Sequence, residues 1–147
     1  MRGTFNFTFD KSSLRGFEAS CEAAISRLGN GSRKALVAAC NEIMDESMAQ
    51  VPLDTSTLLN SAFWEINGDY RTGWQAILGY GGNGDPINPK TGKPASSYML
   101  AVHEDLEAVH PIGKAKFLED PVRAYAAVKF PRTVFKYAQE SLADISD

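Results

Sequence analysis

The chain has 147 residues, of which 44% are hydrophobic and 22% are charged, and its formal net charge is −3 at pH 7. This length fits one domain, and the composition excludes collagen-like, low-complexity and fully disordered chains. The chain has 15 basic and 18 acidic side chains, with no basic half. This charge balance is not that of a protein that clamps nucleic-acid phosphates.

The first ten residues alternate between aromatic and polar side chains. Phe5, Phe7 and Phe9 occupy every second position, which predicts a half-buried strand over residues 4–9. This segment has no apolar run long enough for a signal peptide. No stretch elsewhere approaches the ~18 apolar residues that cross a bilayer, so we expect a soluble protein without a membrane partner.

Two helical patterns follow, separated by a Gly-Asn-Gly sequence. In the first, apolar positions recur at steps of three or four: Leu14, Phe17, Cys21, Ile25 and Leu28. Gly29-Asn30-Gly31 tolerates positive φ and should end this helix, and Ser32 suits the N-cap of a second helix that closes near Pro52. The two helices are therefore expected to form a helical hairpin. Cys21 and Cys40 lie on apolar stripes, which favours reduced core thiols in a cytosol-made protein.

A short helical turn and two strands are predicted in the middle of the chain. Residues 54–57 are rich in capping side chains and precede an apolar pair, so a helical turn should run to about Ser61. Strands are predicted at 62–66 and 74–80, with turn-forming residues between them. Residues 81–97 contain four glycines and three prolines, which is typical of a long flexible loop.

The last third of the chain is predicted to be mainly helical. Helical spacing returns over residues 98–109 and ends before a proline. Asp120 and Pro121 suit an N-cap and a first helical position, and they predict a final helix that Pro131 must kink or split. Taken together, the patterns predict an α+β domain. Its small antiparallel sheet of three to four strands would be packed by an N-terminal helical hairpin and a C-terminal helix.

The two histidines of the chain limit the metal and acid–base chemistry that it could carry. His103-Glu104 begins like a zinc-protease motif, but that motif has its second histidine at i+4, whereas His110 lies at i+7, about 10.5 Å along a helix axis. Residues 79–84 match the letters of a dinucleotide-binding fingerprint, yet Pro86 prevents the helix that must follow. We expect no metal, no cofactor and no catalysis. A small hydrolase or nuclease that uses His103, Glu104 and His110 remains an alternative.

The C-terminal helical segment is locally basic. Residues 121–139 hold four basic side chains and no acidic one: Arg123, Lys129, Arg132 and Lys136. Aromatic residues alternate with them, as on some surfaces that contact nucleic-acid phosphates, although a solvated helix face explains such a pattern more often. A small DNA-binding protein that uses this helix is therefore a second alternative.

Three short motifs stand in a fixed order along the chain. Residues 51–61 read Val-Pro-Leu-Asp-Thr-Ser-Thr-Leu-Leu-Asn-Ser. Gly79-Tyr80 ends a predicted strand, and Tyr98 precedes Val102-His103-Glu104 after the loop. Residues 116–121 read Lys-Phe-Leu-Glu-Asp-Pro. In this order the motifs resemble those of the tailed-bacteriophage minor capsid, or tail-completion (head–tail joining, neck), family.

The family patterns are P-x-D-T-G-x-L-x-x-S, then V-G-Y … Y-A-x-x-V-E/H-x-G-T, then P-F-L-x-P-A at the start of a C-terminal helix. The residues that match them are Pro52, Asp54, Thr55, Leu58, Ser61, Gly79, Tyr98, His103, Glu104, Phe117 and Leu118. Ser56 stands where the family has glycine, and Asp105-Leu106 stands where it has Gly-Thr.

The resemblance implies a non-enzymatic virion protein that assembles as a ring, a hexamer on family grounds, around the DNA channel where head meets tail. Its partners would be copies of itself and other neck, connector or tail-tube proteins, and it would be assembled in the host cytoplasm. DNA would pass through without sequence recognition, and the possible DNA-facing residues are the four basic ones named above. Asp54 or Thr55 would cap the short helix.

Subunit contacts are expected at two places. An unpaired strand edge offers a template for a strand of a neighbour, which makes Phe5, Phe7 and Phe9 candidates. The long loop could order on assembly, and it adds three further candidates: Gly82, Asp85 and Pro86.

Overall fold

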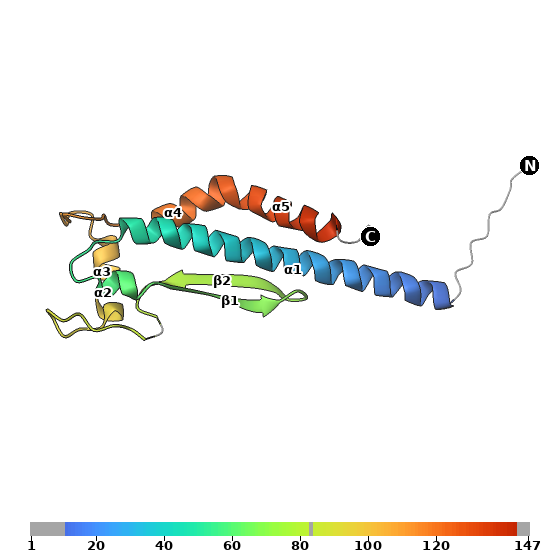
Figure 1. Ribbon diagram of the computed structural model, residues 1–147, viewed down its shortest axis with the longest axis horizontal. Coiled ribbons are helices and arrows are strands. Elements are labelled where there is room, and N and C mark those ends of the chain that lie inside the picture. The colour runs from blue at the N-terminus through green and yellow to red at the C-terminus, as the bar shows by residue number, and fades with distance from the viewer. Residues whose placement is uncertain (1–10, 83, 144–147) are drawn as a thin grey trace, which may run out of the picture.

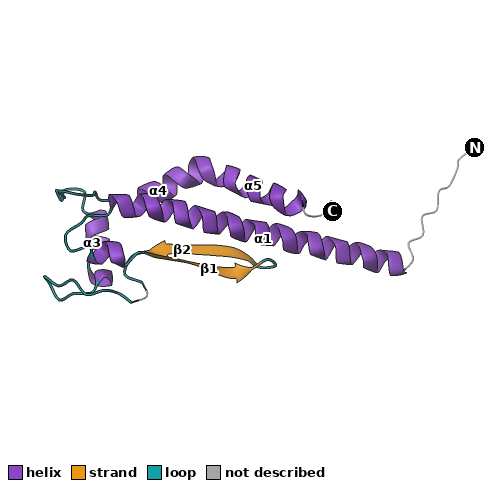
Figure 2. Ribbon diagram, viewed as in Figure 1, coloured by secondary structure: helices purple, strands orange, loops and turns teal. Residues whose placement is uncertain are grey.

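The computed structural model describes residues 11–82 and 84–143. Its elements in chain order are α1 (Lys11–Gln50), α2 (Thr57–Asn60), β1 (Phe63–Asp69), β2 (Gly73–Gly79), η1 (Ala95–Ser97), α3 (Met99–Glu104), α4 (Glu119–Ala124), η2 (Tyr125–Lys129) and α5 (Phe130–Ala143). Figure 1 shows three layers, because α4, η2 and α5 lie on one side of α1 and the β1–β2 hairpin lies on the other. The short helices and the loops gather at the C-terminal end of α1, as the colouring in Figure 2 makes clear.

The longest element, α1, is one continuous helix. Its 40 residues extend about 60 Å at 1.5 Å per residue. The predicted helical hairpin is therefore wrong, because Gly29 and Gly31 lie inside the helix. Packing explains their presence: a Cβ atom on Gly29 would lie 2.3 Å from the Cβ of Tyr70, and one on Gly31 would lie 2.4 Å from the Oγ of Ser141. The missing side chains let the β hairpin and α5 approach the helix closely.

The sheet of the described chain consists of β1 and β2 alone, so the prediction of three to four strands is wrong. The α+β class and the strands predicted at 62–66 and 74–80 are confirmed, and in this antiparallel pair Trp64 lies opposite Leu78. The strand predicted at 4–9 lies outside the described residues. A two-stranded hairpin is marginal by itself in water, and here its half-buried face packs on α1.

Bonds near the hairpin turn fix the hairpin to α1. The Nε1–H of Trp74 donates to the carbonyl of Gly29 at 2.7 Å. The carboxylate of Glu22 accepts a hydrogen bond from the hydroxyl of Tyr70 at 3.1 Å and pairs with Arg71 at 2.8 Å. The hydrogen bond from Arg71 is the main reason that the pKa of Glu22 lies below its usual range. Contact with the hairpin thus reaches Glu22, and α1 continues beyond it (Figure 1).

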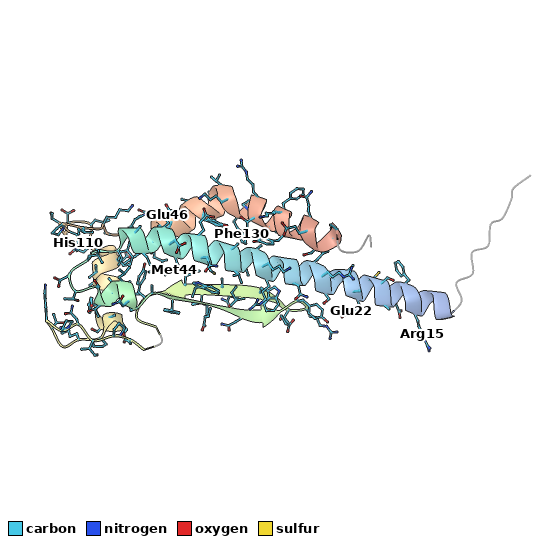
Figure 3. All side chains as sticks on the ribbon, viewed as in Figure 1. Arg15, Glu22, Met44, Glu46, His110 and Phe130 are labelled. Carbon is cyan, nitrogen blue, oxygen red and sulfur yellow. The ribbon has the colours of Figure 1, made fainter. Side chains whose placement is uncertain are left out.

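The C-terminal layer is one helical run with a widened turn in its middle. In η2, a π-turn, the N–H of Phe130 donates to the carbonyl of Tyr125, five residues earlier. Pro131 follows directly. A proline ring clashes with the carbonyl four residues before it in a regular α-helix, so the predicted disturbance at Pro131 takes the form of a wider turn that accommodates the ring. Phe130 packs beside Tyr125, between this layer and α1 (Figure 3).

The helix predicted over residues 98–109 ends early, because α3 stops at Glu104. The carboxylate of Asp105 accepts hydrogen bonds from the N–H groups of Glu107 and Ala108, both at 3.0 Å. Aspartate competes with the helical backbone in this way. The chain therefore turns at Asp105 instead of continuing the helix.

The buried core lies along the C-terminal half of α1. The larger cluster joins α1, α2, β2 and the later loops, and its buried members are Met44, Val51, Leu58, Tyr80, Ala95 and Phe117. A smaller cluster consists of Ala39, Ile43 and Tyr125. Cys40 is buried as predicted, which raises the pKa of its thiol, whereas Cys21 is only half-buried. Between residues 15 and 30 of α1 no residue is buried.

Candidate functional site

The three motifs meet at one place, a cluster of Tyr80, His103 and Phe117 that we call the motif hub. The fully buried ring of Phe117 lies edge-on to Tyr80, with 5.1 Å between ring centroids, and to His103, with 4.9 Å. Edge-to-face contacts of this kind stabilise a core beyond the burial of area. Leu118, half-buried, packs against both core clusters. The motifs therefore specify a packed junction between β2, α3 and the segment before α4.

A buried hydrogen bond joins the motif hub to α1. The Oγ of Ser47 and the hydroxyl of Tyr80 are 2.7 Å apart, and both residues are buried. Burial raises the pKa of the Tyr80 phenol, and the hydrogen bond to Ser47 partly opposes this rise. Ser47 is absent from the predicted site residues. Its signal in the sequence is a polar residue on an apolar helix stripe, since a buried polar group needs a partner.

The first motif packs on the motif hub through Leu58 and Ser61. Leu58 is buried in the same cluster as Phe117. The Oγ of Ser61 donates to the carbonyl of Leu58 at 2.6 Å and accepts from the N–H of Gly81 at 2.9 Å. Gly79 lies against an aromatic ring of β1, which a Cβ atom would approach to 2.9 Å. Ser61 thus ties the end of α2 to the chain that leaves β2.

The turn before α2 has a backbone conformation that favours glycine. Ser56 is the N-cap of α2, and its φ of 60° lies in the left-handed region. A side chain is disfavoured there by about 1–2 kcal/mol, and this is the position at which the family pattern has glycine. The expected cap is not formed, since Thr55 bonds to the hydroxyl of Thr57 at 2.6 Å and Asp54 pairs with Lys90.

Side chains of the second and third motifs form an ionic cluster at the surface of the motif hub. The Nζ of Lys116 pairs with Glu104 and, at 2.8 Å, with Glu119. The Nε2 of His103 accepts from the N–H of Glu119 at 3.3 Å, so its Nδ1 carries the ring proton and donates to Glu104 at 2.7 Å. Hydrogen bonds from Lys116 are the main reason that the pKa values of both glutamates are lowered. The bond to Glu104 is the main reason that the pKa of Lys116 is raised.

A groove of about 520 Å³ opens at the loop end of the molecule. Its lining comes from four segments: residues 52–58 of the first motif, the loop at Asn88–Lys93, Tyr98 with Val102, and residues 110–112. The volume is in the range of ligand pockets, which are mostly apolar with a few polar groups. His110 lines this groove, and its Nε2 is buried without a hydrogen-bond partner among the described residues (Figure 3).

The residues considered for a hydrolase or nuclease do not form one centre. Both ring nitrogens of His103 are engaged in the ionic cluster, whereas His110 lines the groove. In the part of the chain that the structure describes, no group of three His, Cys, Asp or Glu side chains could hold a metal ion. His103 serves the motif hub as a packing and hydrogen-bonding residue.

The basic residues of the C-terminal run lie mostly in ion pairs. Arg123, Lys129 and Lys136 each have a carboxylate within 4.0 Å. Arg132 has no such partner among residues 11–82 and 84–143. Paired cations have less to offer to DNA phosphates, because their charge is already compensated locally.

The interface candidates of the long loop make contacts inside the chain. Gly82 lies under the ring of Phe63, where a Cβ atom would come 2.2 Å from a ring carbon. Asp85 and Pro86 accept hydrogen bonds from the backbone of residues 95–96, so the loop folds back on itself. The other interface candidates lie outside the described residues: Phe5, Phe7 and Phe9.

Large apolar side chains are exposed on several elements of the described chain, including Met48 of α1 and Ile77 of β2. Those at the loop end of the molecule are Leu53, Ile87, Leu100, Leu106, Val109 and Ile112. Those along the helices are Phe17, Ile25, Leu28, Val128, Phe135 and Leu142. Contiguous apolar patches are uncommon on proteins that act alone, and they mark interaction surfaces.

Comparison of the chain with family models, curated proteins and solved structures finds no match. The resemblance to tail-completion proteins therefore rests on the motif residues and on where they lie. Within the described residues, no helix has both the length and the apolar character to cross a bilayer.

Proposed function

We propose that this chain is a head–tail joining, or tail-completion, protein in the neck of a tailed bacteriophage, and that it works by ring assembly around the DNA channel. The observation that carries the proposal is the meeting of the three motifs in the motif hub. Here the first motif packs on the second, and the second on the third.

The backbone at Ser56 gives independent support. The family pattern has glycine at this position, and the left-handed φ of 60° is the conformation that glycine adopts without strain. The backbone at this position thus has a conformation that glycine favours, although the residue here is serine.

The exposed apolar side chains support a role in assembly. Leu100 and Val109 lie at the loop end of the molecule, whereas Phe17 lies near the opposite end of α1. Surfaces of this kind are covered when proteins associate. A subunit with such surfaces at both ends can contact a different neighbour at each.

Native mass spectrometry of the full chain tests the proposal. We expect a closed oligomer near six times the 16.0 kDa mass of the subunit, visible as rings by electron microscopy. Added to DNA-filled heads and separate tails of the parent phage, the chain should increase the yield of joined particles. A chain that stays monomeric at all concentrations and does not increase joining would contradict the proposal.

A variant separates this proposal from the enzyme alternative. His110 lines the groove and is not a member of the motif hub, so we expect the substitution His110→Ala to leave the hub intact. A hydrolase or nuclease that used this histidine would lose turnover in the variant. The tail-completion proposal expects rings and particle joining to be unchanged.

A further inference from the structure

Two helix faces carry exposed apolar side chains that the described chain does not cover. The first, which we call the α1 stripe, consists of Phe17, Cys21, Ile25 and Leu28, and Phe17 is 67% exposed. The second, the α5 stripe, consists of Val128, Phe135 and Leu142, and Phe135 is 63% exposed. Phe135 and Leu142 are seven residues apart in α5, which places them on one side of that helix, and Val128 lies in the π-turn before it.

The two stripes cannot cover each other within one chain. The end of α5 packs beside Gly31, where a Cβ atom would come within 2.4 Å of Ser141. From there α1 runs about 30 Å further to its N-terminal end, past both α5 and the hairpin (Figure 1). The α5 stripe is solvent-exposed, whereas Tyr125 and Ser141 face α1. Each stripe is therefore open to a second molecule.

The two stripes have comparable lengths. From Phe17 to Leu28 is about 16 Å along a helix, and from Val128 to Leu142 is about 21 Å. Two helices of such lengths can pack side by side with their apolar residues interlocked.

One charged side chain beside each stripe could pair with the other. Glu18 is next to the α1 stripe and has no ion pair among the described residues, whereas Glu22 is held by Arg71. Arg15 projects from the side of α1 on which the hairpin lies (Figure 3). Next to the α5 stripe lies Arg132, which also has no ion pair in the described chain. Glu18 of one copy can thus pair with Arg132 of the next when the stripes pack together.

We propose that the α1 stripe of one copy packs against the α5 stripe of the next copy. Because the two surfaces differ, the contact is head-to-tail and repeats from subunit to subunit, and it closes into a ring when the rotation between neighbours divides a full turn. This inference rests on the proposed function and names the contact that builds its ring. Pairing of two α1 stripes would instead give a two-fold dimer, would bring Glu18 toward its copy, and would leave the α5 stripe uncovered.

Cysteine cross-linking tests the contact directly. Cys21 lies in the α1 stripe, and Cys40, the second cysteine of the chain, is buried. The substitution Gln139→Cys adds a thiol at an exposed position beside the α5 stripe. On mild oxidation we expect a ladder of covalent dimers, trimers and larger species, which the further substitution Cys21→Ser should abolish.

The matched control is Gln75→Cys, which adds a thiol on the exposed face of the hairpin and should give no ladder. A dimer formed by Cys21 alone in the unchanged protein would overturn the proposal in favour of two-fold pairing. A ladder that appears only after deletion of Met1–Asp10 would also overturn it, because the chain's own N-terminal residues would then cover the α1 stripe.

Charge reversal gives a second test. Glu18→Arg and Arg132→Glu should each raise the concentration of half-assembly about three- to tenfold, and the double variant should return it to about the original value. Rings that form normally in both single variants and do not cross-link would refute this contact and leave the proposed function standing. A monomeric chain would refute the proposed function itself.

Discussion

The two halves of α1 are built from similar residues and have different surroundings. Residues 31–50 pack against the hairpin, the motif hub and the C-terminal helices, and Cys40, Met44 and Ser47 are buried there. Residues 15–30 include Phe17, Ile25 and Leu28, yet none of them is buried. The comparison teaches that an apolar stripe predicts a covered helix face, while the cover can come from the same chain or from another molecule.

The largest expected effect comes from comparing two phenylalanines. One lies in the core that covers the C-terminal half of α1, and the other lies on the exposed N-terminal half of α1. Phe117→Ala removes a fully buried ring from the motif hub and should lower the free energy of unfolding by about 3–5 kcal/mol. Phe17→Ala should change it by less than about 0.5 kcal/mol, because that ring is exposed in the subunit. Urea denaturation under conditions that keep the chain monomeric measures both. A large loss in the Phe17 variant would mean that the α1 stripe is covered within the subunit.

Glycine substitutions give the next largest contrast. Gly31→Ala places a methyl group 2.4 Å from the Oγ of Ser141 and 2.9 Å from the carbonyl oxygen of Tyr137, and it should cost about 1–3 kcal/mol. Gly16→Ala meets no atom within 4 Å and should stabilise the helix by about 0.5–1 kcal/mol. Thermal and urea unfolding should therefore shift in opposite directions. Equal shifts would show that α1 is not packed as described at Gly31.

Two serine substitutions compare a buried hydrogen bond with an exposed one. Ser47→Ala leaves the buried hydroxyl of Tyr80 without its partner and should cost about 1–3 kcal/mol. Adding Tyr80→Phe removes the unpaired hydroxyl and should recover part of the lost free energy of unfolding. The control is Ser20→Ala, where an exposed hydroxyl bonds to the carbonyl of Gly16 and its loss should be close to neutral.

The smallest effect concerns pH. The pKa values of Glu22 and Glu104 lie below the ordinary value of 4.5, so the folded chain holds these carboxylates ionised more strongly than the unfolded chain does. The stability that they contribute is fully present above about pH 4.5, and it is lost as pH falls through their folded-state pKa values. Arg71→Gln and Lys116→Gln should each reduce the difference between urea midpoints at about pH 7 and pH 3. Both effects should be modest, because the ion pairs are exposed to solvent.

Local patterns were sufficient for much of the fold. The two strands, the turn that carries α2 and the C-terminal helical run follow from periodicity and from turn residues. The expected N-caps are wrong, because Ser56 precedes α2 and Leu118, not Asp120, precedes α4, both without a side-chain cap. The stop at Asp105 also had a local signal, since aspartate readily bonds to the backbone two and three residues ahead. These features depend on neighbours along the chain.

The errors concern contacts between distant segments. Gly29-Asn30-Gly31 has the composition of a turn, and only the approach of Tyr70 and Ser141 shows that its glycines serve close packing. The ionic cluster was missed for the same reason, because Lys116 lies 12 residues from Glu104 and no local spacing marks the pair. Sequence motifs located the residues of the motif hub, but the contacts among them could be seen only in three dimensions.

The continuity of α1 has a mechanical consequence. A helix of 40 residues without a break is a stiff rod about 60 Å long. The core packs against the C-terminal end of this helix. A tilt of about 10° at that end therefore displaces the opposite end by about 10 Å. Had the two glycines formed a hinge, the same tilt would have been absorbed halfway along.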